Sequence, residues 1–296
     1  MTTCSTLGWI FAAAAIPLCA GCGQEVPRGP RADAAVVAQI RSQFMSAETP
    51  ANTTAAAQGT GWAKLSGVIK LSGDPPPARP LAVGGQDAGI CAPGGKAVLT
   101  RSLLVDSGTK GIANVVVFAR KVSRVNDAAA KPASSDAVFD QKDCLFTAPL
   151  VVAQLGQQVV MKNSDPMAHN VKMKPAANPA FNQLISSQNT ATYKATAEEG
   201  FPVQVNCDVH PWMKAYLLFR KTGYFAVTKA DGSFEIPNLP AGEDIEFQIW
   251  HERVPNFTLD AGGIKIDAKG RFKLKLAADA DKKLAVDVPA AAIATE

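Results

Sequence analysis

The stretch that decides the fold is VQVNCDVHPWM, residues 203–213. Its first half alternates apolar and polar residues, which is typical of a half-buried β-strand and places Cys207 on the apolar face. His210 and Met213 then follow at steps of three residues. The stretch therefore predicts a strand that brings a cysteine to the core side, and a tight loop that holds a histidine and a methionine close to it.

A second stretch offers another histidine. It is QQVVMKNSDPMAHNV, residues 157–171, and it predicts a strand and then a loop that ends at His169. Thiolate suits Cu(I), imidazole suits Cu(II), and a long axial thioether is compatible with both. Structural zinc sites use four cysteine or histidine ligands, so a thioether disfavours zinc. The two stretches therefore offer four donors that suit copper better than zinc: His169, Cys207, His210 and Met213.

The two stretches together resemble the plastocyanin and amicyanin branch of the cupredoxins, over about residues 137–222. The Cys-x-x-His-x-x-Met spacing is similar to the short amicyanin form of the ligand loop. The resemblance implies a Greek-key β-barrel, electron transfer between redox partners, and one mononuclear blue-copper site with the ligands His169, Cys207, His210 and Met213. It also implies that Asn170 ties the two ligand loops together and hydrogen-bonds near the thiolate of Cys207, without binding the metal itself.

The supply of histidines bounds the reaction class. A second, catalytic copper needs several more histidines than the three in this chain, and a dinuclear electron-transfer centre needs another cysteine near Cys207. We therefore predict a non-enzymatic electron carrier between a donor and an acceptor protein. Two other functions stay open: a copper-binding or copper-delivery protein that transfers no electrons, and a cell-surface β module with a vestigial metal site. The third histidine, His251, is expected at the surface or in packing.

The same resemblance implies where electrons enter and leave. The ring edge of His210 is expected near solvent, flanked by Pro211 and Trp212 and by Pro166 and Met167 from the other loop. These apolar neighbours predict a small docking patch around the imidazole. The alternative is that they pack beneath a second domain and stabilise the fold.

From residue 62 onward the whole pattern predicts an all-β fold. Short runs rich in Val, Ile and Phe recur between turn clusters, without a sustained helical period. Residues 245–249 alternate apolar and polar side chains, and Asp231-Gly232 predicts a hairpin turn before another strand. Further strands are expected at residues 64–71, 112–120, 157–163, 201–207 and 213–220.

Segments on both sides of the copper stretches resemble a carboxypeptidase regulatory-like domain. They are SGVI at 66–69, NVVV at 114–117 and VTKADGSFEIPNLPAG at 227–242. The resemblance implies a small prealbumin-like β-sandwich. Its two parts are expected at residues 63–136 and 223–296, around a cupredoxin domain at 137–222. Insertion of the cupredoxin unit into this sandwich and a simple tandem arrangement both stay open.

The cysteines suggest an oxidising compartment. Cys4 and Cys19 lie in a predicted N-terminal signal, and a lipid on Cys22 would leave three cysteines in the rest of the chain. If Cys207 is a metal ligand, parity predicts a disulfide between the remaining two, Cys91 and Cys144.

The N-terminus predicts export. Residues 7–18 are apolar, too short to span a bilayer stably, and small residues ending at Cys22 follow. This end of the 1–22 signal peptide is similar to a bacterial lipobox, so Cys22 is predicted to carry a lipid; a plain cleaved signal or an uncleaved anchor stays open. Residues 23–62 are rich in Ala, Pro and Thr and predict a disordered or partly helical tether. The expected location is the periplasm or cell envelope, with a membrane attachment through the lipid.

Charge excludes one class of partner. The net charge is only +4, and no run of Lys or Arg resembles a nucleic-acid patch. A monomer without nucleic-acid partners is expected.

Overall fold

The computed structural model describes residue 35 and residues 61–295. The predicted signal peptide, Cys22 and nearly all of the 23–62 tether lie outside the described residues. Within residues 61–295 the regular structure is almost entirely strands, with only the short helices α2 (Ala88–Cys91) and α3 (Asp127–Ala130) and two 3-10 turns. The all-β prediction is confirmed. No helix in the described part of the chain has the length and apolar character needed to cross a membrane.

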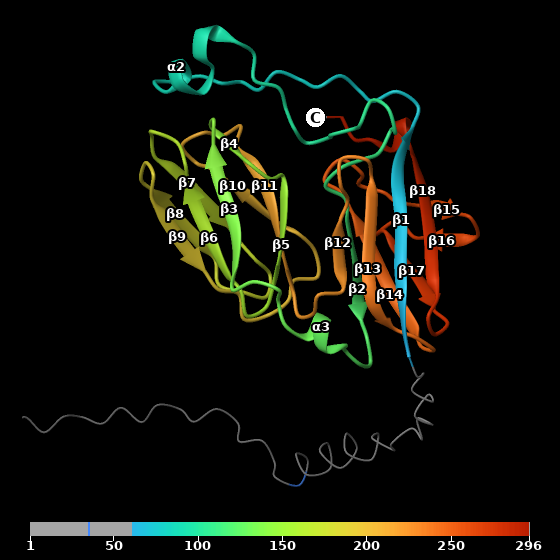
Figure 1. The fold of residues 1–296 in the computed structure, drawn as a ribbon. Coiled ribbons are helices and arrows are strands. Elements are labelled where there is room, and N and C mark those ends of the chain that lie inside the picture. Colours follow the sequence, from blue (N-terminus) through green and yellow to red (C-terminus); the bar gives the residue numbers. More distant parts are fainter. Residues whose placement is uncertain (1–34, 36–60, 296) are drawn as a thin grey trace, which may run out of the picture. The chain divides into compact units, whose positions relative to one another are not determined.

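The strands before β3 and after β11, here called the outer strands, form three sheets (Figure 1). The three-stranded sheet has the order β13-β1-β18, in which β1 is antiparallel to β13 and parallel to β18. The four-stranded sheet has the order β12-β2-β14-β17, and β15 pairs with β16 alone. Their bounds are β1 Trp62–Ser72, β2 Val116–Lys121, β12 Phe225–Val227, β13 Ser233–Pro240, β14 Asp244–Trp250, β15 Leu259–Ala261, β16 Ile264–Ile266, β17 Arg271–Lys275 and β18 Asp281–Pro289.

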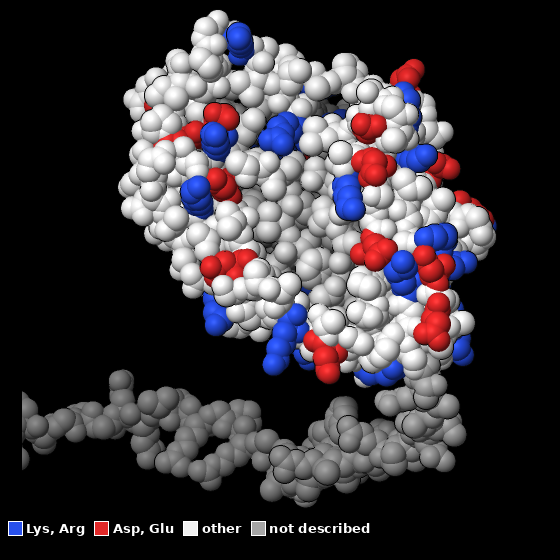
Figure 2. Space-filling view, viewed as in Figure 1, with Lys and Arg blue, Asp and Glu red and all other residues white. Residues whose placement is uncertain are grey.

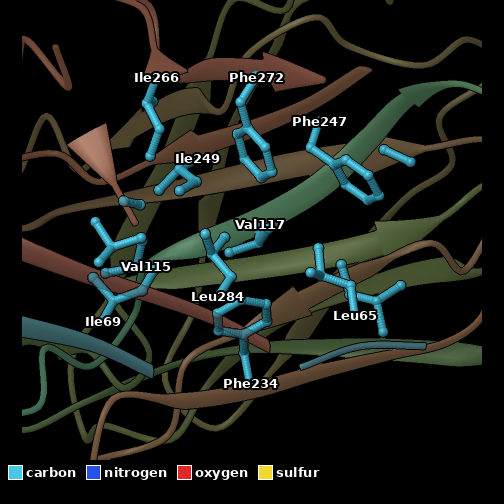
Figure 3. Packing of buried hydrophobic residues seen from close by; sticks show 14 of the residues in the cluster. Leu65, Ile69, Val115, Val117, Phe234, Phe247, Ile249, Ile266, Phe272 and Leu284 are labelled. Carbon is cyan, nitrogen blue, oxygen red and sulfur yellow. The ribbon is translucent and has the colours of Figure 1, made fainter. Parts of the chain in front are cut away.

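The alternation predicted at residues 245–249 places one face of β14 in the outer core. Ile249 and Phe247 are fully buried and lie in one cluster with Leu65 of β1 and Leu284 of β18 (Figure 3). Burying a side chain of this size stabilises the fold by about 1.5–3 kcal/mol. The core between the outer sheets is therefore built from strands at both ends of the described chain.

The predicted Asp231-Gly232 turn depends on its glycine. Gly232 has a φ of +79°, and a Cβ there would lie 2.2 Å from the carbonyl oxygen of Ile69. The carboxylate of Asp231 accepts from the backbone N–H of Ser233 at 2.9 Å. Only glycine allows this backbone conformation together with such a close approach to β1.

The inner strands form two further sheets, with the orders β5-β11-β10-β7-β8 and β4-β3-β6-β9. A separate apolar cluster that includes Phe139, Met161, Val205 and Leu217 fills the space between them. Their bounds are β3 Asp136–Lys142, β4 Leu145–Phe146, β5 Leu150–Gln154, β6 Gln158–Asn163, β7 His169–Met173, β8 Phe181–Ile185, β9 Thr190–Tyr193, β10 Val203–Asn206 and β11 Lys214–Arg220.

The inner sheets do not close into the predicted barrel. Strands β8 and β9 follow one another in the chain but belong to different sheets. At this junction the side-chain amide of Asn163 donates to the carbonyl oxygens of Ile185 and Ser186 at 3.0 and 3.1 Å. The two sheets thus meet here through a side chain and not through a strand pairing, and this part of the chain is a two-sheet sandwich.

The inner strands are inserted between two neighbouring strands of an outer sheet. The chain leaves that sheet after β2 and returns to it at β12, and these two strands pair directly, with Phe118 opposite Phe225. No strand pairing within residues 61–295 joins β3–β11 to the outer strands. The sequence leaves insertion and a tandem arrangement open, and this strand order corresponds to insertion. The likeness of the outer sheets to a carboxypeptidase regulatory-like domain stays a prediction.

Arg220, the last residue of β11, links the inner and outer strands. Its buried guanidinium donates to the carbonyl oxygens of Glu199 and Ala119, both at 2.9 Å, and lies 4.5 Å from the ring centre of Phe118. An apolar cluster surrounds this contact, with Leu150 and other residues of β2, β5 and β11. The two groups of sheets therefore share a packed interface in the described chain.

The long segment between β1 and β2 has no regular strand and carries α2. A disulfide joins Cys91 of α2 to Cys144 in the turn between β3 and β4, with a Cα–Cα distance of 5.3 Å. Figure 1 shows α2 beyond the end of the inner sheets at which β4 and β7 are labelled. The predicted Cys91–Cys144 disulfide is therefore present, and it ties a segment of the outer unit to the inner one.

Candidate metal centre

Three of the four predicted ligands converge at one end of the inner sandwich. His169 is the first residue of β7, Cys207 follows the last residue of β10, and His210 lies in the turn between β10 and β11. The Nδ1 atoms of the two histidines are 2.9 Å apart, and the Sγ of Cys207 lies 3.9 Å from the Nδ1 of His210. The exposed fractions of His169, Cys207 and His210 are 0%, 2% and 2%. The donor atoms thus face one another in a site closed to solvent.

Backbone hydrogen bonds close the ligand loop. The N–H of Met213 donates to the carbonyl oxygen of His210 at 2.9 Å, and the N–H of Cys207 donates to that of Met213 at 3.2 Å. Met213 is completely buried and belongs to the same apolar cluster as Cys207. The steps of three residues seen in the sequence therefore correspond to a compact turn that holds all three side chains on the core side.

Two backbone N–H groups point at the sulfur of Cys207. The N–H of Asn170 lies 3.2 Å from this Sγ, and the N–H of His210 lies 3.4 Å from it. The side chain of Asn170 accepts from the N–H of Asp208 at 3.0 Å. Asn170 therefore makes both contacts that the resemblance implies, one to the sulfur and one between the loops. Its role at a bound metal stays a prediction.

A buried carboxylate holds the other ring nitrogen of His169. The Nε2 of His169 lies 2.7 Å from the carboxylate of Asp165, which also accepts from the backbone N–H groups of Asp143 and Cys144 at 2.7 and 2.8 Å. Burial lowers the pKa of His169, against the hydrogen bond and charge of Asp165, which raise it. A low pKa favours the neutral imidazole, which is the form that binds a metal. The sequence reasoning missed Asp165, although a carboxylate four residues before a candidate ligand was a signal for it.

The expected exposure of His210 is wrong. The carboxylate of Asp87, from the segment between β1 and β2, lies 3.2 Å from the Nε2 of His210 and covers the ring edge. Trp212 lies on another side of the imidazole, with ring centres 5.0 Å apart, and its indole N–H donates to the carbonyl oxygen of Cys144 at 3.1 Å. The predicted docking patch around the imidazole, including Met167, therefore does not exist in that form.

His251 lies away from this centre and is buried, with an exposed fraction of 3%. Its Nδ1 accepts from the backbone N–H of Arg253 at 3.2 Å. Of the two places expected for His251, packing is right and the surface is wrong.

The chemistry of the donors fits copper better than the alternatives. Two imidazoles and one thiol lie within 4.8 Å of one another, and the thioether of Met213 is buried in the same apolar cluster as the thiol. Zinc in structural sites takes four cysteine or histidine ligands, and magnesium and calcium take oxygen. A second group, Cys144, Asp165 and His169, also lies close together, but Cys144 is oxidised to a disulfide and offers no thiolate.

A groove with a cavity volume of about 780 Å³ runs beside the ligand loop. One wall comes from the segment before α2, including Leu81, and another from the ligand loop, including Pro211 and Trp212. Arg101 lies at its edge. Val209, Pro211 and Trp212 of the ligand loop therefore face a concave part of the described surface.

Comparisons with known proteins give only a weak likeness. No protein-family model and no curated protein matches the sequence. Among solved structures, amicyanin from Paracoccus versutus is similar at 20% identity and a TM-score of 0.26, covering 35% of this chain and 97% of that chain. An oxidised amicyanin variant has 19% identity and the same TM-score, covering 31% and 89%. A Cu(I) form of another variant has 17% identity and a TM-score of 0.27, covering 35% and 98%. TM-scores this low do not place the chain in a family.

Proposed function

We propose that this chain binds one copper ion through His169, Cys207, His210 and Met213, and exchanges single electrons with redox proteins. The observation that carries the proposal is the convergence of donor atoms: two imidazole Nδ1 atoms 2.9 Å apart, and a thiol sulfur 3.9 Å from one of them. When bound in such a donor set, copper supplies one-electron exchange between Cu(II) and Cu(I).

Contacts within the protein orient three of the four proposed ligand side chains. Asp165 holds His169, Asp87 holds His210, and the N–H of Asn170 points at the sulfur of Cys207. Groups fixed by such contacts move little when the charge of a bound ion changes. This rigidity supports an electron-transfer role, because electron transfer is fast where the ligands need little rearrangement.

The surface by which electrons pass differs from the one predicted from the sequence. With the imidazole of His210 covered, the solvent-exposed residues of the ligand loop are Asp208, Val209, which is 44% exposed, and Pro211. Pro211 and Trp212 also line the groove. We place the approach of the redox partner at this groove. Lys and Arg are interspersed with Asp and Glu on the face in Figure 2, so charge would give little long-range steering.

Location and attachment belong to the same proposal. An exported chain with a lipid on Cys22 would hold the copper site at a membrane surface in the periplasm or cell envelope, where a Cys91–Cys144 disulfide persists. We propose no enzymatic activity for the chain, and a monomer as its working form.

A second function is favoured by the sealed site. The buried imidazole of His210 suits a protein that stores or delivers copper and transfers no electrons. Voltammetry and stopped-flow mixing of the copper-loaded protein separate the two functions. The proposed carrier cycles reversibly between Cu(II) and Cu(I) and exchanges electrons on the millisecond scale or faster. Slow exchange, together with quantitative transfer of Cu(I) to a thiol-rich acceptor peptide, would support the second function and reject the first.

A further inference from the structure

The carboxylate of Asp87 does not cap the helix that it precedes. Asp87 is the N-cap residue of α2, a position at which an aspartate side chain normally accepts from the first turn of the helix. Its side chain makes no such cap hydrogen bond. Its Oδ2 lies 3.2 Å from the Nε2 of His210, 123 residues away in the chain. The contact with His210 therefore replaces the local contact that this residue type usually makes.

Covalent and hydrogen-bonded contacts fix Asp87 over the ligand loop. Four residues after it, Cys91 is bonded to Cys144. The carbonyl oxygen of Cys144 accepts from the indole N–H of Trp212, and its N–H donates to Asp165, the partner of His169. Cys144 thus connects both histidine–carboxylate pairs, and the disulfide brings Asp87 into the same framework.

We propose that Asp87 is a positioning residue for His210, supplied to the metal centre by the segment between β1 and β2. Its carboxylate accepts the Nε2–H of His210, which leaves the Nδ1 lone pair directed at His169 and Cys207. A carboxylate behind a ligating imidazole fixes its tautomer and ring orientation and makes it a stronger donor. The proposal rests on the proposed copper site. It adds that the site is complete only with the segment between β1 and β2 in place.

The alternative is that Asp87 and His210 form an ordinary contact that only packs the segment. Two observations favour a positioning role over packing alone. The imidazole is 2% exposed and the Asp87 side chain 21% exposed, so the pair is largely removed from solvent. The segment also covers the ring edge of His210, which the resemblance to cupredoxins placed near solvent. A merely packing contact would have no effect on the tautomer of His210 or on the affinity for copper.

The test uses the full chain and two substitutions of Asp87. Asp87→Ala removes the acceptor, and Asp87→Asn keeps an acceptor but removes the charge. With Asp87→Ala we expect copper affinity to fall about 10- to 100-fold, the range for loss of such a partner. The reduction potential should move to more positive values in both variants, because a negative charge behind the imidazole favours Cu(II). The visible copper–thiolate band should remain, since Cys207 is unchanged.

Asp74→Ala is the matched control. Asp74 lies in the same segment with its side chain 98% exposed, and its ion pair with Lys110, at 3.5 Å, is on the surface. An ion pair exposed in this way contributes little to the stability of the fold. We expect this variant to keep the affinity and the potential of the wild type. Equal affinity and potential in wild type and Asp87→Ala would overturn the proposal.

A metal-free readout separates this inference from the copper proposal. Nitrogen NMR of the histidine rings should show His210 as the Nε2–H tautomer in the wild type and as a mixture of tautomers in Asp87→Ala. If the wild type binds no copper but the tautomer shifts, the proposed function fails and the positioning role of Asp87 stands. If copper binds but the tautomer and the affinity are both unchanged in Asp87→Ala, only the role of Asp87 is rejected.

Discussion

The backbone N–H of Asp208 donates to the side-chain oxygen of Asn170 at 3.0 Å, and this contact joins the two loops that carry the candidate ligands. Asn170 is the neighbour of His169, and Asp208 is the neighbour of Cys207. This side chain therefore helps to set the position of the first histidine relative to the cysteine, together with the pairing of β7 with β10 and the ion pair between Lys172 and Asp208 at 3.0 Å.

Asn170→Ala should loosen this connection while keeping the backbone N–H that points at Cys207. We expect copper to bind about 10-fold more weakly and to dissociate faster, with the visible band retained. The control is Asn182→Ala, which removes only the other partner of the Asn170 side chain, at 2.6 Å. Competition with a chelator measures both variants. Equal affinities in the two variants would show that the contact with Asp208 does not hold the site.

Met213→Leu tests the role of the thioether. The two side chains have similar volumes, so replacement in this buried position should cost less than about 1.5 kcal/mol of stability. Because an axial ligand tunes the site and does not build it, the colour should remain and the reduction potential should rise. Voltammetry measures the shift. An unchanged potential would remove Met213 from the ligand set.

Loss of the disulfide should both destabilise the chain and open the site. For a sequence separation of 53 residues, the chain-entropy model gives about 4 kcal/mol for the Cys91–Cys144 bond. The double variant Cys91→Ser/Cys144→Ser should therefore unfold at lower denaturant concentration. It should also let an imidazole-modifying reagent reach His210 faster than in the wild type. Wild-type rates of modification in the variant would mean that other contacts hold the α2 segment closed.

His251 makes the stability of the metal-free protein depend on pH. Burial lowers the pKa of His251 from 6.5 to about 4, so the unfolded chain binds a proton there more readily than the folded one. The stabilisation is complete above pH 6.5 and is lost as the pH falls towards 4, by at most about 3 kcal/mol. The pKa of His169 is lowered too and acts in the same direction.

The effect of His251 is isolated by comparing the wild type with His251→Gln, which can still accept from the N–H of Arg253. Denaturant unfolding between pH 7 and pH 4 should give a smaller loss of stability in the variant. Parallel curves for the two proteins would contradict the lowered pKa.

Much of the site could be predicted from local patterns. The alternation before Cys207 and the steps of three residues to His210 and Met213 predict a strand and a turn, and both are present. Cysteine parity predicted the Cys91–Cys144 pair. The strand and the turn depend on residues close in sequence, and the disulfide follows from the number of cysteines.

The carboxylate partners of the two histidines, and the burial of His210 beneath the segment before β2, could not be predicted in the same way. Asp87 lies in a segment without apolar periodicity, and its contact with His210 joins positions 123 residues apart. That contact depends on how the segment packs on the inner strands, which is set by the disulfide and by the contact of Val83 with the inner apolar cluster. The expected closure of the barrel is wrong for a similar reason: β8 and β9 belong to different sheets, and local sequence patterns do not specify which strands pair.

The most direct test of the central claim is the visible and electron paramagnetic resonance spectrum of the protein during titration with Cu(II). We predict that one equivalent produces an intense thiolate-to-Cu(II) band, that a reductant bleaches it, and that Cys207→Ser abolishes it, because an alcohol oxygen is a poor ligand for copper in such a site. A titration that ends without this band in the wild type, or a band that survives in Cys207→Ser, would contradict the assignment of a blue-copper site.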